Sequence, residues 1–416
     1  MTSREKLQKC LAHESGPVPV DFGGTAVSGI HCSVVENLRN HYGLEKKPVK
    51  VNEPYQMLGE VEDDLRDALG IDVVGVFPRN TLFGFPLGNW KEWRTPWGQE
   101  VLVPGEFNTR MEGEDVFIYP EGDTSVPASG RMPGSGFFFD SIIRQPPIED
   151  DKLNPEDNLE EFKPVSDEEL DYFEKVLKEA GETGKGVIAN FGGTAFGDIA
   201  LVPAPFLKKP RGIRDITEWY VSTVMRQDYI HAIFEKQSEI AVSNLEKIYA
   251  RVGNIPDAVF ICGTDFGTQD SQFCSTDTFD TLYAPYYKKV NNWIHENTEW
   301  KTFKHSCGAV LPFMDNFIDS GFDIINPVQC SAADMDPQTL KNRFGEKLVF
   351  WGGGVDTQKT LPFGTPKEVK KEVRERLEIF SENGGYVFDA IHNVQAKTPI
   401  ENMAAMFDTV RDFNSN

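Results

Sequence analysis

Trp300-Lys301-Thr302-Phe303-Lys304-His305-Ser306-Cys307-Gly308 is the stretch that decides the fold. A short run with apolar residues ends in polar residues and a glycine, which is typical of a buried strand that stops at a loop. Segments with helical periodicity lie on both sides of it, over Thr278 to Asn297 and Val310 to Ser320. A strand enclosed by helices predicts a βαβ unit and therefore a parallel sheet.

The same alternation continues along the chain. A further amphipathic helix is predicted over Pro366 to Glu382. The other predicted strands are the apolar runs at 18–22, 72–76, 186–191, 258–262, 322–326, 347–351 and 385–388. At least six such units in a row favour a closed (β/α)8 barrel, while an open doubly wound sheet is the alternative. We expect one domain over 1–416, with an N-terminal extension.

Residues 79–150 differ from the rest of the chain because they are rich in Gly, Pro and aromatic residues. They include Trp90, Trp93, Trp97 and the run Phe137-Phe138-Phe139. The stretch Thr95-Pro96-Trp97-Gly98 predicts a hairpin turn between short strands. We therefore expect an aromatic-rich insertion at the barrel mouth, the end where the strands finish.

Charge and composition limit the possible partners. The net charge is -23, which repels nucleic acid backbones and anionic membranes. The chain has no run of 18 apolar residues, and its N-terminus lacks the apolar core of a signal peptide, so we expect a cytoplasmic protein without a membrane span. Six scattered cysteines indicate free thiols. An exposed barrel face could support a homodimer.

His305 and Cys307 are the sharpest chemical signal. Two residues apart on an extended chain, their side chains share a face and can bind one metal ion. Nitrogen and sulfur ligands suit zinc, which needs a third protein ligand from another strand end. His392 and Cys330 are the two candidates. The alternative is a buried histidine bonded to backbone beside an inert cysteine.

The loop Gly263-Thr264-Asp265-Phe266-Gly267-Thr268-Gln269 follows a strong apolar run. Asp265 would project into the barrel mouth, where an acid can act as a base, anchor a substrate or orient a metal-bound histidine. We predict catalytic roles for Asp265 and Gln269. An aspartate that only caps a turn is the alternative.

Polar and aromatic residues at the other strand ends are predicted to bind the substrate. Gly352-Gly353-Gly354 would let a ligand approach the backbone closely, although a tight turn with Asp356 capping a helix explains the pattern as well. The aromatic stretch after the run at 186–191 has a similar alternative, in which aromatic side chains pack under a loop. The predicted substrate-binding residues are Phe191, Asn326, Gln329, Asp356 and Tyr386.

Several of these segments together resemble the uroporphyrinogen decarboxylase superfamily and, within it, the cobalamin-dependent methyltransferase branch. The matching stretches are Asp265 to Gln269, His305 to Gly308, Asp334 to Gly345, Gly352 to Gln358, and Gly384-Gly385-Tyr386 through Pro399-Ile400-Glu401-Asn402. Their order matches that of the family. The resemblance implies a (β/α)8 barrel.

The resemblance also implies chemistry. The methyltransferase branch holds zinc with His-x-Cys and a distant cysteine, which would make His305 and Cys307 ligands and place His392 where the family has its cysteine. Cobalamin would come on a partner corrinoid protein, because this chain has no Asp-x-His-x-x-Gly motif. The implied function is methyl transfer between that cobalamin and a small methylated, possibly methoxylated aromatic, substrate.

Two other functions stay open at this point. The first is a metal-free lyase like the decarboxylases of the family, whose Arg-Gln-Ala-Gly-Arg motif grips the carboxylates of a tetrapyrrole. Here that region has no arginine and reads Val18-Pro19-Val20-Asp21-Phe22-Gly23-Gly24-Thr25, which disfavours a substrate with many carboxylates. The second is a barrel that binds a ligand without catalysis.

Overall fold

A curled sheet of seven parallel strands forms the centre of the computed structural model, which describes residues 1–159 and 162–415. Its order is β16-β15-β14-β13-β12-β11-β4, so the strands from β11 to β16 neighbour one another in chain order. Their bounds are β4 (Val73–Val76), β11 (Gly186–Ala189), β12 (Ala258–Cys262), β13 (Lys301–His305), β14 (Ile324–Asn326), β15 (Val349–Trp351) and β16 (Tyr386–Val387). All of these strands were predicted, with ends that differ from the prediction by at most two residues.

The segment around Val20 takes the eighth position and closes the barrel. The amide of Asp21 donates to the carbonyl of Phe388 at 2.9 Å, just past β16, and the amide of Asp72 donates to the carbonyl of Val20 at 2.8 Å, just before β4. This segment therefore bonds to both edge strands of the seven-stranded sheet. The predicted (β/α)8 barrel is confirmed, and the open-sheet alternative is wrong.

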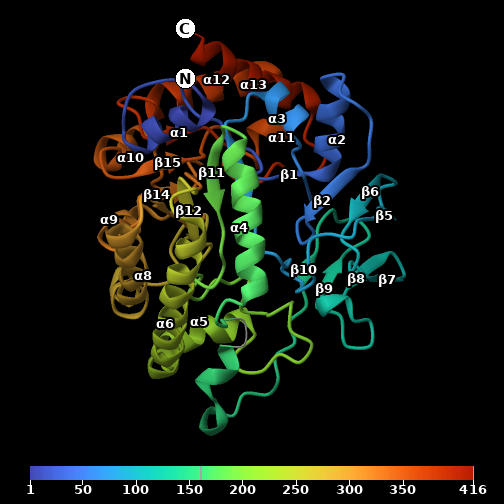
Figure 1. Ribbon diagram of the computed structural model, residues 1–416, viewed down its shortest axis with the longest axis vertical. Helices are drawn as coiled ribbons and strands as arrows, with labels where there is room; N and C mark the ends of the chain where they lie inside the picture. Colours follow the sequence, from blue (N-terminus) through green and yellow to red (C-terminus); the bar gives the residue numbers. More distant parts are fainter. Residues whose placement is uncertain (160–161, 416) are drawn as a thin grey trace.

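Helix α1 (Ser3–Leu11) covers the amino-terminal end of the barrel. Leu7, Cys10 and Leu11 belong to the same buried cluster as inward-facing side chains of the strands, such as Phe303 and Trp351. In Figure 1 the arrow of β11 points away from α1, toward the end where α5 (Ile216–Met225) lies. The carboxyl ends of the strands, which form the mouth, are thus at the end opposite α1.

Helices surround the barrel, and α4 runs beside β11 (Figure 1). The remaining helices are α2 (Cys32–His41), α3 (Asp63–Leu69), α4 (Asp167–Glu182), α6 (Gln227–Val252), α7 (Thr276–Thr278), α8 (Ala284–Asn297), α9 (Met314–Asp319), α10 (Pro337–Phe344), α11 (Thr360–Phe363), α12 (Pro366–Phe380) and α13 (Ile400–Asn414). Within residues 1–159 and 162–415, none of the helices is long and apolar enough to cross a membrane.

Three aspartates connect neighbouring strands at the amino-terminal end of the barrel. Each one directly precedes a strand or its apolar run and accepts a hydrogen bond from a backbone amide of the strand before it. Asp72 accepts from Val20, Asp257 accepts from Val187 at 2.9 Å, and Asp323 accepts from Thr302 at 2.8 Å. These carboxylates satisfy amides that the parallel ladder leaves free.

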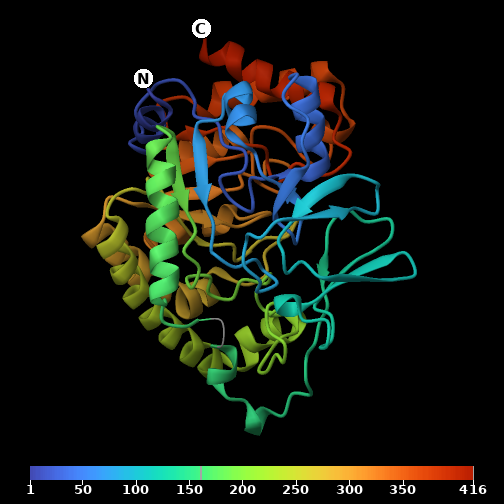
Figure 2. The same cartoon turned by 45° about the vertical axis from the view of Figure 1, so that its right-hand side comes forward.

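Two smaller sheets lie beside the barrel (Figure 2), a mixed one with the order β1-β3-β2-β6-β5 and an antiparallel one with the order β10-β9-β8-β7. Their strands are β1 (Ile30–His31), β2 (Val49–Glu53), β3 (Leu58–Gly59), β5 (Lys91–Arg94), β6 (Glu100–Val103), β7 (Thr109–Glu112), β8 (Asp115–Ile118), β9 (Gly130–Met132) and β10 (Asp140–Ser141). β5 and β6 pair antiparallel around the turn at 95–98, which confirms the predicted hairpin. Buried rings such as Phe83 and Phe107 form the core of this region.

Candidate metal centre

His305 and Cys307 lie at the carboxyl end of β13, inside the mouth. Nε2 of His305 is 3.3 Å from Sγ of Cys307, and the His305 side chain is buried. The strand ends at His305, and the chain turns at Gly308, whose φ of +89° favours glycine. A side chain on Gly308 would collide with the backbone of Gly267 and Thr268, so the two loops at the mouth pack closely.

His392 completes a group of three potential metal ligands. It follows β16, and its ring lies edge-on to that of His305, with centroids 5.4 Å apart. His305, Cys307 and His392 each offer one ligand atom, and these three atoms lie within 4.8 Å of one another. In the described part of the chain this is the one such group, and Cys330 is not in it. Nδ1 of His392 accepts a hydrogen bond from the Asn393 amide at 2.8 Å, which any metal-bound form would have to adjust.

Asn326 orients His305. Nδ2 of Asn326 donates to the carbonyl of Trp351 at 2.9 Å, which leaves its Oδ1 facing Nδ1 of His305 at 2.6 Å. Nδ1 of the neutral ring therefore carries the proton, and the lone pair of Nε2 points toward Cys307. A histidine held in this way by a polar neighbour is a typical arrangement around metal ligands. Asn326, predicted to bind substrate, lies behind the histidine.

Burial keeps the three potential ligands uncharged. It lowers the pKa of His305 to about 4 and that of His392 to about 4, against the opposing effect of their polar neighbours. Burial, with a smaller contribution from the nearby Asp265 carboxylate, raises the pKa of the Cys307 thiol well above its usual range. Nε2 of His305 offers a lone pair to a metal, whereas His392 would first have to change its hydrogen bond with the Asn393 amide, and a cation that binds here would displace the thiol proton.

Asp265 lies next to the group, as predicted for the loop after β12. Its Oδ1 accepts a hydrogen bond from the Cys307 amide at 2.7 Å and is 4.0 Å from Nε2 of His305. Burial raises the pKa of Asp265 above its usual value. Its carboxylate thus positions the backbone of Cys307, while its catalytic role stays a prediction.

Gln269 and Gln329 bond to each other near the same loop. Oε1 of Gln329 accepts from the Gly308 amide at 2.7 Å, and its Nε2 donates to Oε1 of Gln269 at 2.9 Å. Nε2 of Gln269 donates to the carbonyl of Ser331 at 2.8 Å. Both glutamines therefore hold the turn after Cys307 in place.

The other predicted residues lie in different surroundings. Cys330 bonds to the carbonyl of Val328, and Asp356 accepts hydrogen bonds from the amides of Gln358 and Lys359, as the turn-capping alternative expects. Phe191 packs against Phe173 and Trp300, and Tyr386 packs against Phe380 of α12. The structure thus places Phe191 and Tyr386 among core aromatic rings rather than beside His305.

Sequence reasoning missed three polar residues near the centre. Lys304 is fully buried, and its Nζ donates to the carbonyls of Thr264 and His305 at 2.5 and 2.7 Å. Asp198 and Tyr220 lie close enough to Asp265 for its charge to raise their pKa values, which burial raises most. Lys304 was quoted with the His-x-Cys stretch, but Asp198 and Tyr220 lie in segments with no pattern that marks them.

Comparison with known proteins places the chain in a family. The family model for uroporphyrinogen decarboxylase (URO-D) matches residues 144–413. The chain belongs to the uroporphyrinogen decarboxylase family. The matched region contains β11 to β16, the loop with Asp265 and the three potential metal ligands. The match does not extend to β4 or to the segment around Val20, so it gives no information on how these two segments compare with the family.

Relatives in the uroporphyrinogen decarboxylase family are distant. A uroporphyrinogen decarboxylase from Trichodesmium erythraeum (strain IMS101) is 23% identical over 288 residues, which cover 68% of this chain and 75% of that protein. One from Ruthia magnifica subsp. Calyptogena magnifica is 23% identical over 191 residues, 45% of this chain and 50% of that protein. A solved structure, a methyltransferase from Methanosarcina mazei, is 14% identical with a TM-score of 0.54 and covers 99% of both chains, so the two share a fold.

Proposed function

We propose that this chain is a zinc-dependent methyltransferase that moves a methyl group between a small methylated substrate and the cobalamin of a partner corrinoid protein. The observation that carries the proposal is the group formed by His305, Cys307 and His392 at the barrel mouth. The fold shared with a methyltransferase from Methanosarcina mazei supports the reaction class within this family.

The donor set fits zinc. Two imidazole nitrogens and one thiolate are ligands that zinc prefers, and three protein ligands leave one position for a substrate. The 3.3 Å between Nε2 of His305 and Sγ of Cys307 suits two ligands at zinc bond lengths of about 2.0–2.3 Å. The ring of His305 is already fixed by Asn326 with Nε2 directed to Cys307.

In the proposed reaction, zinc and cobalamin would supply the methyl-transfer chemistry, and the side chains of this chain position the ligands and hold protons. Bound zinc would supply Lewis acidity at the heteroatom that carries the methyl group, for example a methoxy oxygen. Cobalamin on the partner would accept or donate the methyl group. Asn326 and Asp265 hold His305 and Cys307 in position. Asp265 or Asp198 can hold a proton for the demethylated oxygen, because burial raises both pKa values.

Metal analysis tests the proposal. Purified protein, reconstituted with zinc and dialysed, should retain about one zinc per chain, and His305→Ala should lose it. Cys330→Ala should keep the zinc, because Cys330 lies outside the group of three ligands. With a corrinoid protein or free cob(I)alamin, the zinc-loaded enzyme should demethylate a small methylated donor. Wild-type enzyme that is fully active after complete zinc removal would contradict the proposal.

Porphyrinogen decarboxylation is the second candidate, because the family model and both relatives carry that name. The segment at 18–25 speaks against it. In place of arginines it brings Asp21 into the barrel, where burial raises the pKa of this carboxyl to about 6 and the nearby Asp389 is also fully buried. Neither carboxyl supplies the positive charge that a polycarboxylate needs for binding. Conversion of uroporphyrinogen by metal-free protein would establish this alternative instead.

A further inference from the structure

Exposed apolar side chains are concentrated at the mouth of the barrel. Four of the nine large apolar side chains that are exposed within residues 1–159 and 162–415 belong to helix α5 or to the loop after β12, and they are Val221, Val224, Met225 and Phe273. Val224 and Met225 are 69% and 74% exposed. Helix α5 lies at the end of the molecule opposite α1, where the strands finish (Figure 1). Apolar side chains grouped in this way are typical of surfaces that another molecule covers.

These four side chains form one continuous area, which we call the α5 surface. Val221, Val224 and Met225 are spaced three and four residues apart on one helix and therefore share a face. Tyr220, one turn before Val224, connects this face to Phe273. The rings of Tyr220 and Phe273 are stacked, with centroids 4.8 Å apart and an angle of 13° between their planes. The α5 surface thus extends from the helix onto the loop after β12.

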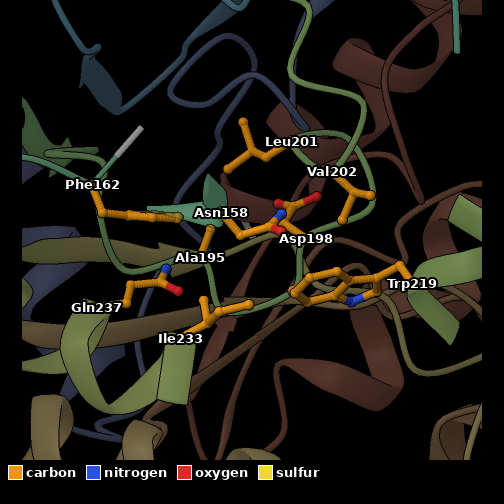
Figure 3. A pocket seen from close by; sticks show the side chains of 10 residues that line it. Asn158, Phe162, Ala195, Asp198, Leu201, Val202, Trp219, Ile233 and Gln237 are labelled. Carbon is orange, nitrogen blue, oxygen red and sulfur yellow. The ribbon is translucent and has the colours of Figure 1, made fainter. Parts of the chain in front are cut away.

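The opposite face of α5 is packed against the rest of the protein. Trp219, Ser222 and Thr223 on that face are buried. The Trp219 ring lies beside Ile233 of α6 (Figure 3), and its centroid is 6.1 Å from that of the Phe234 ring in the same helix. The helix is therefore held in place from within, and its outer apolar face is presented to solvent in a fixed position.

The α5 surface is uncharged, although the chain as a whole has a net charge of -23. Glu218 is the one charged residue within α5, and it pairs at 3.3 Å with Arg226, which also pairs with Asp150 at 2.6 Å. Residues 271–276, around Phe273, have no charged side chain. Apolar centres without free charges are typical of interface cores. An uncharged, largely apolar molecule therefore complements this surface, whereas charged groups would find no partner on it.

The α5 surface borders the loop that reaches the candidate metal centre. The Phe273 amide donates to the Phe266 carbonyl at 2.9 Å, and Phe266 directly follows Asp265. Oδ1 of Asp265 accepts from the Cys307 amide at 2.7 Å. Tyr220 also lies close to Asp265, because after burial the Asp265 carboxylate has the next largest effect in raising the pKa of Tyr220. A molecule that covers the α5 surface therefore also lies next to the metal centre.

We propose that the α5 surface is the docking site for the corrin ring of the cobalamin that the partner corrinoid protein carries. The inference rests on the proposed function, in which cobalt has to approach a methyl group bound at the metal centre. A corrin ring suits the surface because its edge consists of methyl and amide groups without charge. A second copy of this chain on the same surface would instead lie across the mouth and hinder that approach.

Binding of free methylcobalamin, which contains the same ring, tests the proposal. Equilibrium dialysis against wild-type protein stripped of metal measures it, because cobalamin absorbs visible light. Met225→Glu places a charge in the α5 surface and should weaken methylcobalamin binding about tenfold, which corresponds to the loss of one buried apolar side chain. Met111→Glu is the matched control. Met111 is 65% exposed on β7, which lies far from α5 in Figure 1, so this variant should bind methylcobalamin like wild type.

Val224→Ser is a second variant, which removes apolar surface without adding a charge, and it should weaken methylcobalamin binding about three- to tenfold. Circular dichroism verifies that each variant is folded. Wild-type protein that does not bind methylcobalamin, or wild-type affinity in both Met225→Glu and Val224→Ser, would overturn the proposal. A change from dimer to monomer in Met225→Glu with unchanged methylcobalamin binding would also overturn it and assign the surface to a second copy of this chain. Because the protein is metal-free, these results do not depend on the zinc content that tests the proposed function.

Discussion

At the scale of single residues, Asn326 shows how a side chain that does not itself bind the metal sets the orientation and protonation of a metal ligand, His305. Replacing it with leucine removes the acceptor that keeps the proton on Nδ1 of His305. We expect Asn326→Leu to weaken zinc binding by about 10–100-fold. Competition with a chelator of known affinity measures the change. The zinc affinity of Asn326→Asp, which keeps an acceptor oxygen, should stay within a few-fold of wild type. Equal zinc affinities of Asn326→Leu and wild type would contradict the expected role of Asn326.

Asp21 gives a prediction for stability against pH. Burial raises its pKa from 3.8 to about 6, despite hydrogen bonds from Trp351 and Gly24 that act in the opposite direction. The folded chain then binds more protons than the unfolded chain between about pH 4 and 6. The contribution of Asp21 to stability is therefore greatest below pH 4, falls as the pH rises to 6, and is constant above, a total loss of about 3 kcal/mol.

Asp21→Asn cannot ionise, so it removes this dependence. In urea unfolding at a series of pH values, the stability difference between Asp21→Asn and wild type should shift in favour of the variant as the pH rises from 4 to 6. The variant also loses one acceptor for the Trp351 indole, which lowers its stability by an amount that does not change with pH. Parallel stability curves over this range would show that Asp21 has an ordinary pKa.

Sequence could predict some of these residues and not others. His305 and Cys307 were visible because two ligands on one strand end share a face, and His392 was visible because it follows another strand end. Asp198 and Tyr220 belong to a loop and to helix α5, which meet only after the barrel has folded. Phe191 and Tyr386 were assigned to the substrate because they border strand ends; in the structure Tyr386 is buried against Phe380, and the half-buried Phe191 packs against Phe173 and Trp300.

At the scale of elements, the aspartates before the strands connect the barrel to its covering helix. Asp72 accepts from the Val20 amide, from Nζ of Lys6 at 2.6 Å and from Oγ of Ser3 at 2.8 Å. It thus joins α1, the closing segment and β4. Its sequence context, an acid directly before an apolar run, recurs at Asp257 and Asp323, but a pattern of single residues does not reveal which amide each one binds.

Asp72→Ala should destabilise the protein by about 2–4 kcal/mol, because it leaves the buried Val20 amide without a partner. The shift of the urea midpoint measures this loss. Asp67→Ala is the control, since Asp67 is exposed and its ion pair with Lys185 contributes at most about 1 kcal/mol. Zinc affinity should be the same in both variants, because Asp72 lies at the opposite end of the barrel from His305. If Asp72→Ala destabilised the protein no more than Asp67→Ala does, contacts other than those of Asp72 would be responsible for closing the barrel.

At the scale of the whole molecule, the two halves of the chain differ in how much their sequence reveals. The second half repeats strand and helix at regular spacing, and its predicted strands and helices agree with the structure. In the first half β2 pairs with β6 in parallel and with β3 antiparallel, and the pairing of β2 with β6 joins segments that are far apart in sequence. Such pairing depends on which edges meet in three dimensions, so short aromatic-rich strands predict a hairpin but not the sheet that contains it.

Helix α1 also has a kinetic consequence. Since it covers one end of the barrel, we expect molecules to reach His305 from the opposite end. If a corrinoid protein docks over that end, a small donor has to enter before the partner arrives, and its product leaves only after the partner departs. Initial rates would then follow an ordered sequence with the small molecule first, and a large excess of the partner would slow turnover by delaying product release.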